Sequence, residues 1–155
     1  SYTDRERKTE NLTIKNPNID TVKGSMEFVF KTPKNFLIMS NYTNAPVIES
    51  PTNVSGLRFF MMESGTALMT MWGGMSDYVS FQWKPDTNYT VRLEWENGYI
   101  SAYVDDVFMQ RKATSISNVS TELYLGMDSY NSRRSGMIFK SMTIKDRNGN
   151  ITLQF

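Results

Sequence analysis

The segment TVRLEWENGYISAYVDD, Thr90 to Asp106, constrains the fold more than any other part of the chain. Apolar and polar residues alternate along it, stop alternating at Asn97-Gly98, and then alternate again. Asn-Gly between two alternating runs predicts a β-hairpin with a two-residue type I′ turn, because both central residues of that turn need a positive φ. A turn of this length also fixes which residues face each other across the hairpin.

The predicted register divides the hairpin into two faces. One face is apolar and is expected to point into a core: Val91, Leu93 and Trp95 lie opposite Val104, Ala102 and Ile100. The other face is polar and aromatic: Arg92 lies opposite Tyr103, Glu94 opposite Ser101, and Glu96 opposite Tyr99. Because antiparallel sheets commonly leave one face in water, the second set predicts an outer sheet face.

Runs of strand length continue from Leu12 to the end of the chain, rich in aromatic and β-branched residues and bounded by Gly, Pro, Asn and Asp. Apolar spacings of three and four never persist beyond one turn, so no amphipathic helix is expected. About ten strands must close into a sandwich or barrel to bury their apolar faces and edges. The sequence therefore predicts an all-β domain over residues 12–155, preceded by a lead-in or linker over residues 1–11, with a long loop over residues 41–55.

Composition excludes several kinds of site. The 155 residues contain no Cys and no His, which excludes a thiol nucleophile, a Ser-His-Asp triad and a Cys or His zinc site. Seventeen Lys and Arg against sixteen Asp and Glu leave a charge of +1, so a nucleic-acid partner is not expected. No apolar run approaches the ~20 residues of a membrane-spanning helix.

The hairpin segment YTVRLEWENGYISAYVDDVFM resembles that of concanavalin A-like jelly-roll modules, which include laminin G-like, pentraxin-like and related carbohydrate-binding domains. YVDD stands where these modules usually have YVDG. Downstream, LYLGM and SGMIFKSMTIKD resemble the end of the same fold, which puts Phe139, Met142 and Ile144 at core positions. The resemblance covers roughly Ser25 to Asp146 and implies an antiparallel β-sandwich, the concanavalin A-like jelly roll.

The resemblance implies a non-catalytic, lectin-like domain that binds glycans, in a secreted or cell-surface protein. A structural or protein-interaction domain is the alternative, in which the polar sheet face is only solvated. A glycoside hydrolase or lyase is less favoured, because the Glu-x-Asp-x-(x)-Glu motif of the glucanases with this fold is absent. Since the sequence starts at Ser1, we expect a piece of a larger multidomain protein.

The expected ligand-binding residues lie in three places. Arg92, Glu94 and Tyr103 on the hairpin would bind sugar hydroxyls, and Arg92 would bind an acidic sugar through paired hydrogen bonds. If YVSFQW lies beside the hairpin, Tyr78 and Gln82 extend the same face. Trp72 precedes Gly-Gly and either stacks on a sugar or belongs to the core, whereas Trp83 and Trp95 fall on the inward phase. The third place is the loop GMDSYNSRRSG, with Tyr130, Asn131, Arg133 and Arg134.

No cofactor is predicted from the residues themselves. Jelly-roll modules of this kind often hold a structural calcium ion through Asp, Asn and backbone oxygens. Four aspartates near expected turns could contribute, although no Asp-rich loop with ligand spacing is present: Asp105, Asp106, Asp128 and Asp146.

Overall fold

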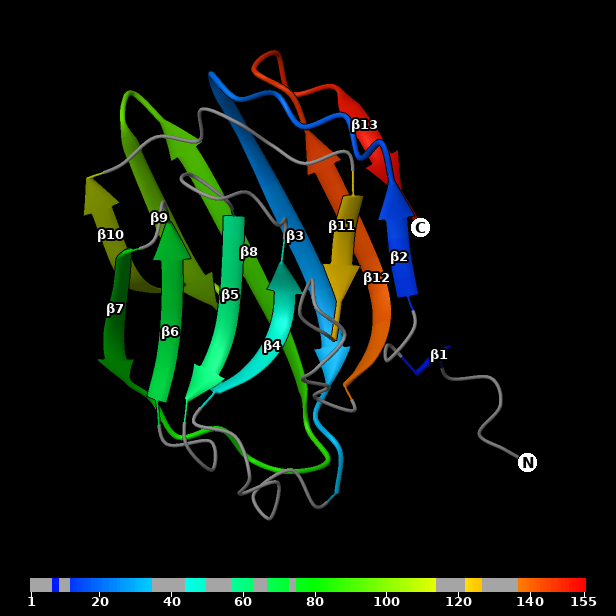
Figure 1. Ribbon diagram of the computed structural model, residues 1–155, viewed down its shortest axis with the longest axis vertical. Helices are drawn as coiled ribbons and strands as arrows, with labels where there is room; N and C mark the ends of the chain where they lie inside the picture. Colours follow the sequence, from blue (N-terminus) through cyan, green and yellow to red (C-terminus); the bar gives the residue numbers. More distant parts are fainter. Residues whose placement is uncertain are drawn as a thin grey trace.

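The protein is a sandwich of two antiparallel β-sheets, as Figure 1 shows for the computed structural model. The structure describes residues 7–8, 12–34, 44–49, 57–62, 67–72, 75–113, 122–126 and 137–155, with the backbone alone for residues 7, 8, 12, 44–49, 57–62, 67–72 and 75–80. These residues form strands and connections but no helix, which confirms the predicted all-β antiparallel sandwich. In this part of the chain there is accordingly no helix that could cross a bilayer.

The seven-stranded sheet carries the hairpin as the neighbouring strands β8 and β9, and its main path has the order β1-β12-β3-β8-β9-β10, with β13 also paired to β12. All its pairings are antiparallel. The bounds are β1 Arg7–Lys8, β3 Lys23–Lys31, β8 Asn88–Glu96, β9 Tyr99–Val104, β10 Val107–Ala113, β12 Ile138–Lys145 and β13 Ile151–Gln154. Strand β1 lies within the segment predicted as a lead-in; the boundary between lead-in and domain stays a prediction.

The six-stranded sheet lies in front of the first sheet in Figure 1 and has the order β2-β11-β4-β5-β6-β7. Its bounds are β2 Leu12–Lys15, β11 Glu122–Leu125, β4 Asn44–Glu49, β5 Leu57–Met62, β6 Ala67–Trp72 and β7 Met75–Ser80.

The predicted hairpin is confirmed. Asn97 and Gly98 have φ values of 51° and 77°, as a type I′ turn requires. All six predicted cross-strand pairs between β8 and β9 are present. The β9–β10 turn is built in the same way, because Asp105 and Asp106 have φ values of 48° and 63°. Asp105 also accepts a hydrogen bond from the Thr90 amide through Oδ1, at 2.9 Å, which ties the turn back to β8.

The core fills the space between the sheets with the inward phases of the strands. β3 alternates buried and less buried residues along its whole length, and the predicted inward residues of the hairpin are at most 3% exposed. Phe139, Met142 and Ile144 are buried as expected. From the six-stranded sheet, Leu123 and Leu125 of β11 are fully buried against this set.

The run YVSFQW is one of the predicted runs of strand length, but β7 ends at Ser80 and includes only its first three residues. The reason is topological: β7 belongs to the six-stranded sheet and β8 to the seven-stranded sheet, so the chain crosses between layers here. Trp83 is nevertheless fully buried, and its ring meets Phe81 and Tyr89 edge-to-face at 4.5 and 4.7 Å. The alternation of apolar and polar residues in YVSFQW therefore indicates which side chains are buried, and it does not indicate that the whole run pairs as a strand.

The loop predicted over residues 41–55 is also wrong in part, because β4 lies within it and pairs with both β5 and β11. Proline lacks the amide that a ladder needs, so a strand through Pro46 requires a local irregularity. The register of β4 and β5 shifts between Pro46 and Ile48, and an irregularity of that kind accommodates a proline.

We expect Gly24→Ala to lower the free energy of unfolding by about 1–3 kcal/mol, the usual cost of overpacking. An added Cβ would lie 2.7 Å from the carbonyl oxygen of Lys145 and 2.8 Å from the Trp95 ring, and the carbonyl belongs to a paired strand. Gly24 is not among the residues with positive φ, so the contact alone would cause the loss. Denaturant unfolding measures it, with Ser25→Ala on the opposite face as the matched control. Equal stability of the two variants would contradict the expectation.

Candidate functional site

A single line of outward residues crosses the seven-stranded sheet at right angles to its strands. The registers place Lys145 of β12 beside Ser25 of β3, Ser25 beside Glu94 of β8, and Glu94 beside Ser101 of β9. Ser101 in turn lies beside Arg111 of β10. We call these five residues the cross-strand row. A charged residue stands at each end, a carboxylate lies in the middle, and a serine separates them on each side.

The cross-strand row lies in a cleft of about 570 Å³ on the outer face of the sheet. The two serines have short side chains and flank Glu94, whereas the long side chains of Lys145 and Arg111 stand at the ends of the row. Tyr99, Lys23 and Arg147 add to the lining. A hollow therefore forms where small residues lie between large ones, and it exposes polar groups along its length.

The side chains of the row differ in how they are engaged within the described residues. The hydroxyls of Ser25 and Ser101 have no hydrogen-bond partner there, and Lys145 has no carboxylate partner. The Arg111 guanidinium lies 4.0 Å from the centre of the Tyr99 ring, also without a carboxylate. By contrast, Lys23 is paired with Glu96 at 3.5 Å. Two cations, two hydroxyls and the Tyr99 ring, which is 42% exposed as a residue, are thus open to a ligand.

Glu94 is held in place by Arg92. The Nε of Arg92 donates to Oε2 of Glu94 at 3.0 Å, and Nη1 donates to Oδ1 of Asp106 at 2.5 Å. The guanidinium also lies over the Tyr103 ring, 4.3 Å from its centre. The hydrogen bond to Asp106 is the main cause of a raised Arg92 pKa. Arg92 and Tyr103 therefore support Glu94 from the adjacent row, and they do not line the cleft.

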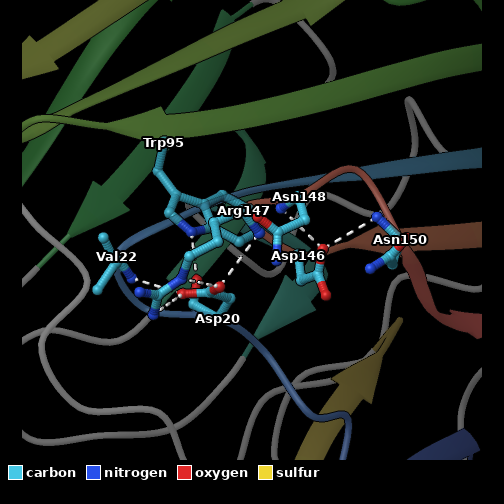
Figure 2. Close-up of polar contacts among 7 residues, drawn as sticks. All are labelled: Asp20, Val22, Trp95, Asp146, Arg147, Asn148 and Asn150. Carbon is cyan, nitrogen blue, oxygen red and sulfur yellow. Dashed lines mark hydrogen bonds and ion pairs between the residues drawn. The ribbon is translucent and has the colours of Figure 1, made fainter.

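Asp20 accepts hydrogen bonds from Arg147, which lines the cleft, as Figure 2 shows. Its carboxylate accepts hydrogen bonds from the amide of Val22 and from the amide, Nε and Nη2 of Arg147, at 2.7 to 3.1 Å. Its carbonyl oxygen accepts a hydrogen bond from Trp95 Nε1 at 2.7 Å. These contacts join the segment before β3 to the turn between β12 and β13 and to β8. The hydrogen bonds from Arg147 hold the Asp20 pKa well below its usual range.

Sequence reasoning did not find Arg111, Lys145 or Ser25. A β-bulge explains why Arg111 was not predicted, because the register of β10 shifts between Phe108 and Gln110. Regular alternation from Phe108 would place Gln110 beside Ser101, and the extra residue places Arg111 there instead. Ser25 and Lys145 are on the outward phases of their strands, which the sequence does show. Their nearness to Glu94 depends on the strand order, which alternation cannot give.

The other predicted site residues lie elsewhere or outside the description. The condition set for Tyr78 and Gln82 is not met, because β7 belongs to the six-stranded sheet and is not beside β8. Gln82 is exposed after β7, and its Nε2 donates to the Trp83 carbonyl at 3.0 Å. Trp72 is the last residue of β6, and its side chain is outside the description. Also outside the described residues lie Tyr130, Asn131, Arg133 and Arg134.

The aspartates considered for calcium already have protein partners where they are described. Asp105 accepts from the Thr90 amide, Asp106 binds Arg92, and Oδ1 of Asp146 accepts from the amides of Asn148 and Asn150. Asp128 is outside the described residues. Within the described ranges there is no group of three or more His, Cys, Asp or Glu side chains that could hold a metal ion.

Comparisons with known proteins identify the fold. No protein-family model matches the chain, and no curated protein sequence matches it. Among solved structures, the Caenorhabditis elegans galectin LEC-6 has a TM-score of 0.59 at 12% identity, over 94% of this chain and 99% of the galectin. Mouse laminin alpha1 domains LG4-5 have a TM-score of 0.61 at 16% identity, over 90% of this chain and 39% of the laminin chain.

Trypanosoma rangeli sialidase has a TM-score of 0.62 at 11% identity, over 80% of this chain but only 20% of the enzyme. At such identities, similarity establishes the fold alone. The chain therefore has the concanavalin A-like jelly-roll fold that its hairpin resembles. It spans well under half the length of the laminin and sialidase chains that it matches.

We expect acid to destabilise the protein partly through Asp20. A carboxyl whose pKa is lowered in the folded state contributes stability above its unfolded pKa, and the contribution is lost as pH falls through the folded pKa. From the ordinary value of 3.8, this loss begins as pH drops below about 4. Asp20→Asn should lower the melting temperature at pH 7 and flatten its fall towards pH 2.

Melting temperatures measured from pH 7 to pH 2 by circular dichroism test this expectation. Asp86→Asn is the control, because it removes a surface carboxylate that pairs with Lys31 at 3.1 Å, away from the cleft. An Asp20→Asn profile parallel to that of the wild type would show that Asp20 does not contribute to the acid sensitivity.

Proposed function

We propose that this protein is a non-catalytic, lectin-like domain that binds a glycan in the cleft on the outer face of the seven-stranded sheet. The observation that carries the proposal is the cross-strand row, whose hydroxyls, carboxylate and cations line one hollow of about 570 Å³. Sugars offer many hydroxyls that both donate and accept, so a glycan site needs several fixed polar groups in line. The galectin and laminin likenesses support the proposal at the level of the fold.

Each group in the cleft has a defined part in this binding. Glu94 accepts hydrogen bonds from sugar hydroxyls, since Oε2 is occupied by Arg92 and Oε1 is not engaged by it. Ser25 and Ser101 donate to or accept from the neighbouring hydroxyls. Tyr99 provides an aromatic surface for the apolar side of a sugar ring at the rim. Because Arg92 fixes Glu94 before the ligand arrives, less side-chain entropy is lost on binding.

For the predicted residues outside this cleft, we propose only a supplementary contribution to glycan binding. The loop with Tyr130, Asn131, Arg133 and Arg134 would add a second contact region. We further propose that the domain acts outside the cell or at the cell surface, as one part of a longer protein. This chain matches 39% of the laminin chain, which contains domains LG4 and LG5. That partial match supports the proposal that the domain belongs to a longer protein.

We expect Glu94→Gln to weaken glycan binding about tenfold or more, because a hydrogen bond to a charged group contributes about 1.5–3 kcal/mol. A glycan array identifies the ligand, and calorimetry measures its affinity for the variant. Glu27→Gln is the matched control, since it removes a carboxylate from the next row of the same face, outside the cleft.

Unchanged affinity in Glu94→Gln would place the glycan elsewhere on the molecule. Absence of any bound glycan on the array would overturn the proposal and favour a structural or protein-interaction domain.

A further inference from the structure

We propose that the ligand of the cleft is an acidic oligosaccharide that lies across the strands, with one acidic group at each end of the row and an uncharged sugar over its centre. This inference rests on the proposed function and specifies its ligand. The observation behind it is the order of charges along the cross-strand row: Lys145, Ser25, Glu94, Ser101 and Arg111.

The two end cations differ from most of their charged neighbours. Arg92 is bound by Glu94 and Asp106, Arg147 by Asp20, and Lys23 by Glu96. Lys145 and Arg111 have no such carboxylate among the described residues, although both line the cleft. Unpaired cations at the two ends of one hollow attract anionic groups at two separate points.

Arg111 is prepared for a planar anion. The Cζ atom of its guanidinium lies 4.0 Å from the centre of the Tyr99 ring, and this cation–π contact restricts the freedom of the side chain. A guanidinium presents a fixed pair of parallel donors that matches a carboxylate, whereas an ammonium acts as a compact charge. Arg111 therefore suits the carboxylate of a uronic acid or a related acidic sugar, and Lys145 suits any anionic group.

The middle of the cross-strand row favours an uncharged group, whereas its two ends favour anions. Glu94 carries the negative charge there, and its partner Arg92 lies in the adjacent row, outside the cleft. A second carboxylate over Glu94 would be repelled, while a hydroxyl would donate to it. With strands about 4.8 Å apart, the end cations are about 19 Å apart at the backbone, so they cannot bind the same acidic group. The charge order thus favours acidic sugars that are separated by neutral sugars over an unbroken run of acidic sugars.

Three hexasaccharides of similar length test the inference by calorimetry: hyaluronan, which alternates a uronic acid with a neutral sugar, cellohexaose, which is neutral, and hexagalacturonate, which is acidic throughout. We expect hyaluronan to bind most tightly. Its affinity should fall as the salt concentration rises, because exposed ion pairs are screened. Arg111→Gln and Lys145→Gln should each weaken hyaluronan binding roughly three- to tenfold and leave cellohexaose binding unchanged.

Two further variants separate this role from a general effect on the protein. Arg111→Lys keeps the charge but not the paired donors, so it should recover part of the lost affinity. Lys31→Gln removes a cation of the same sheet that lies outside the cleft and should change nothing. Thermal unfolding of each variant shows whether the fold is retained.

The outcomes distinguish this inference from the proposed function. Equal binding of neutral and acidic hexasaccharides, with Glu94→Gln weakening both, would overturn the inference and leave the glycan site in place. Tightest binding of hexagalacturonate would overturn the preference for acidic sugars that are separated by neutral ones. Binding of no hexasaccharide together with an empty glycan array would overturn both proposals.

Discussion

The two-residue turn at Asn97-Gly98 is the constraint on which the site depends. A longer or shorter turn would shift β9 against β8, and in a strand a shift of one residue moves every side chain to the other face. The same register that buries Trp95 against Ile100 places Glu94 beside Ser101. The turn therefore determines both the apolar pairs of the hairpin in the core and the polar pair of the hairpin in the cleft. A change that altered the turn would lose the apolar packing and the polar row together.

A second local irregularity completes the row. The bulge in β10 turns Arg111 to the outer face beside Ser101, where regular pairing would have placed Gln110. Bulges change the direction of a side chain without moving the strands far, and they are frequent beside functional sites. Tyr99 then supports Arg111 from the neighbouring strand. The cationic end of the cleft is therefore created by one extra residue in an edge strand of the sheet.

The sequence predicts the fold of this chain well where pairing is local and poorly where it is not. Hairpin registers follow from the turn residues, and burial follows from alternation, so the core residues of β8, β9 and β12 could be named in advance. Strand order is different, because it depends on which distant segments pair. For that reason YVSFQW could not be assigned to its sheet, and Ser25 and Lys145 could not be placed beside Glu94. Glu94 was recognised as outward-facing beside Ser101, but Ser25, Lys145 and Arg111 were not recognised as its neighbours in the cleft.

The order of the strands has a consequence for how a ligand would act on the whole protein. Ser25 and Lys145 come from near opposite ends of the chain, and the β3–β12 pairing brings them together. In the unfolded chain these groups are far apart, so a ligand that contacts both binds only the folded state. Binding of that kind shifts the unfolding equilibrium by mass action. A ligand bound in the cleft would then stabilise the fold by linking residues from the first and last parts of the domain.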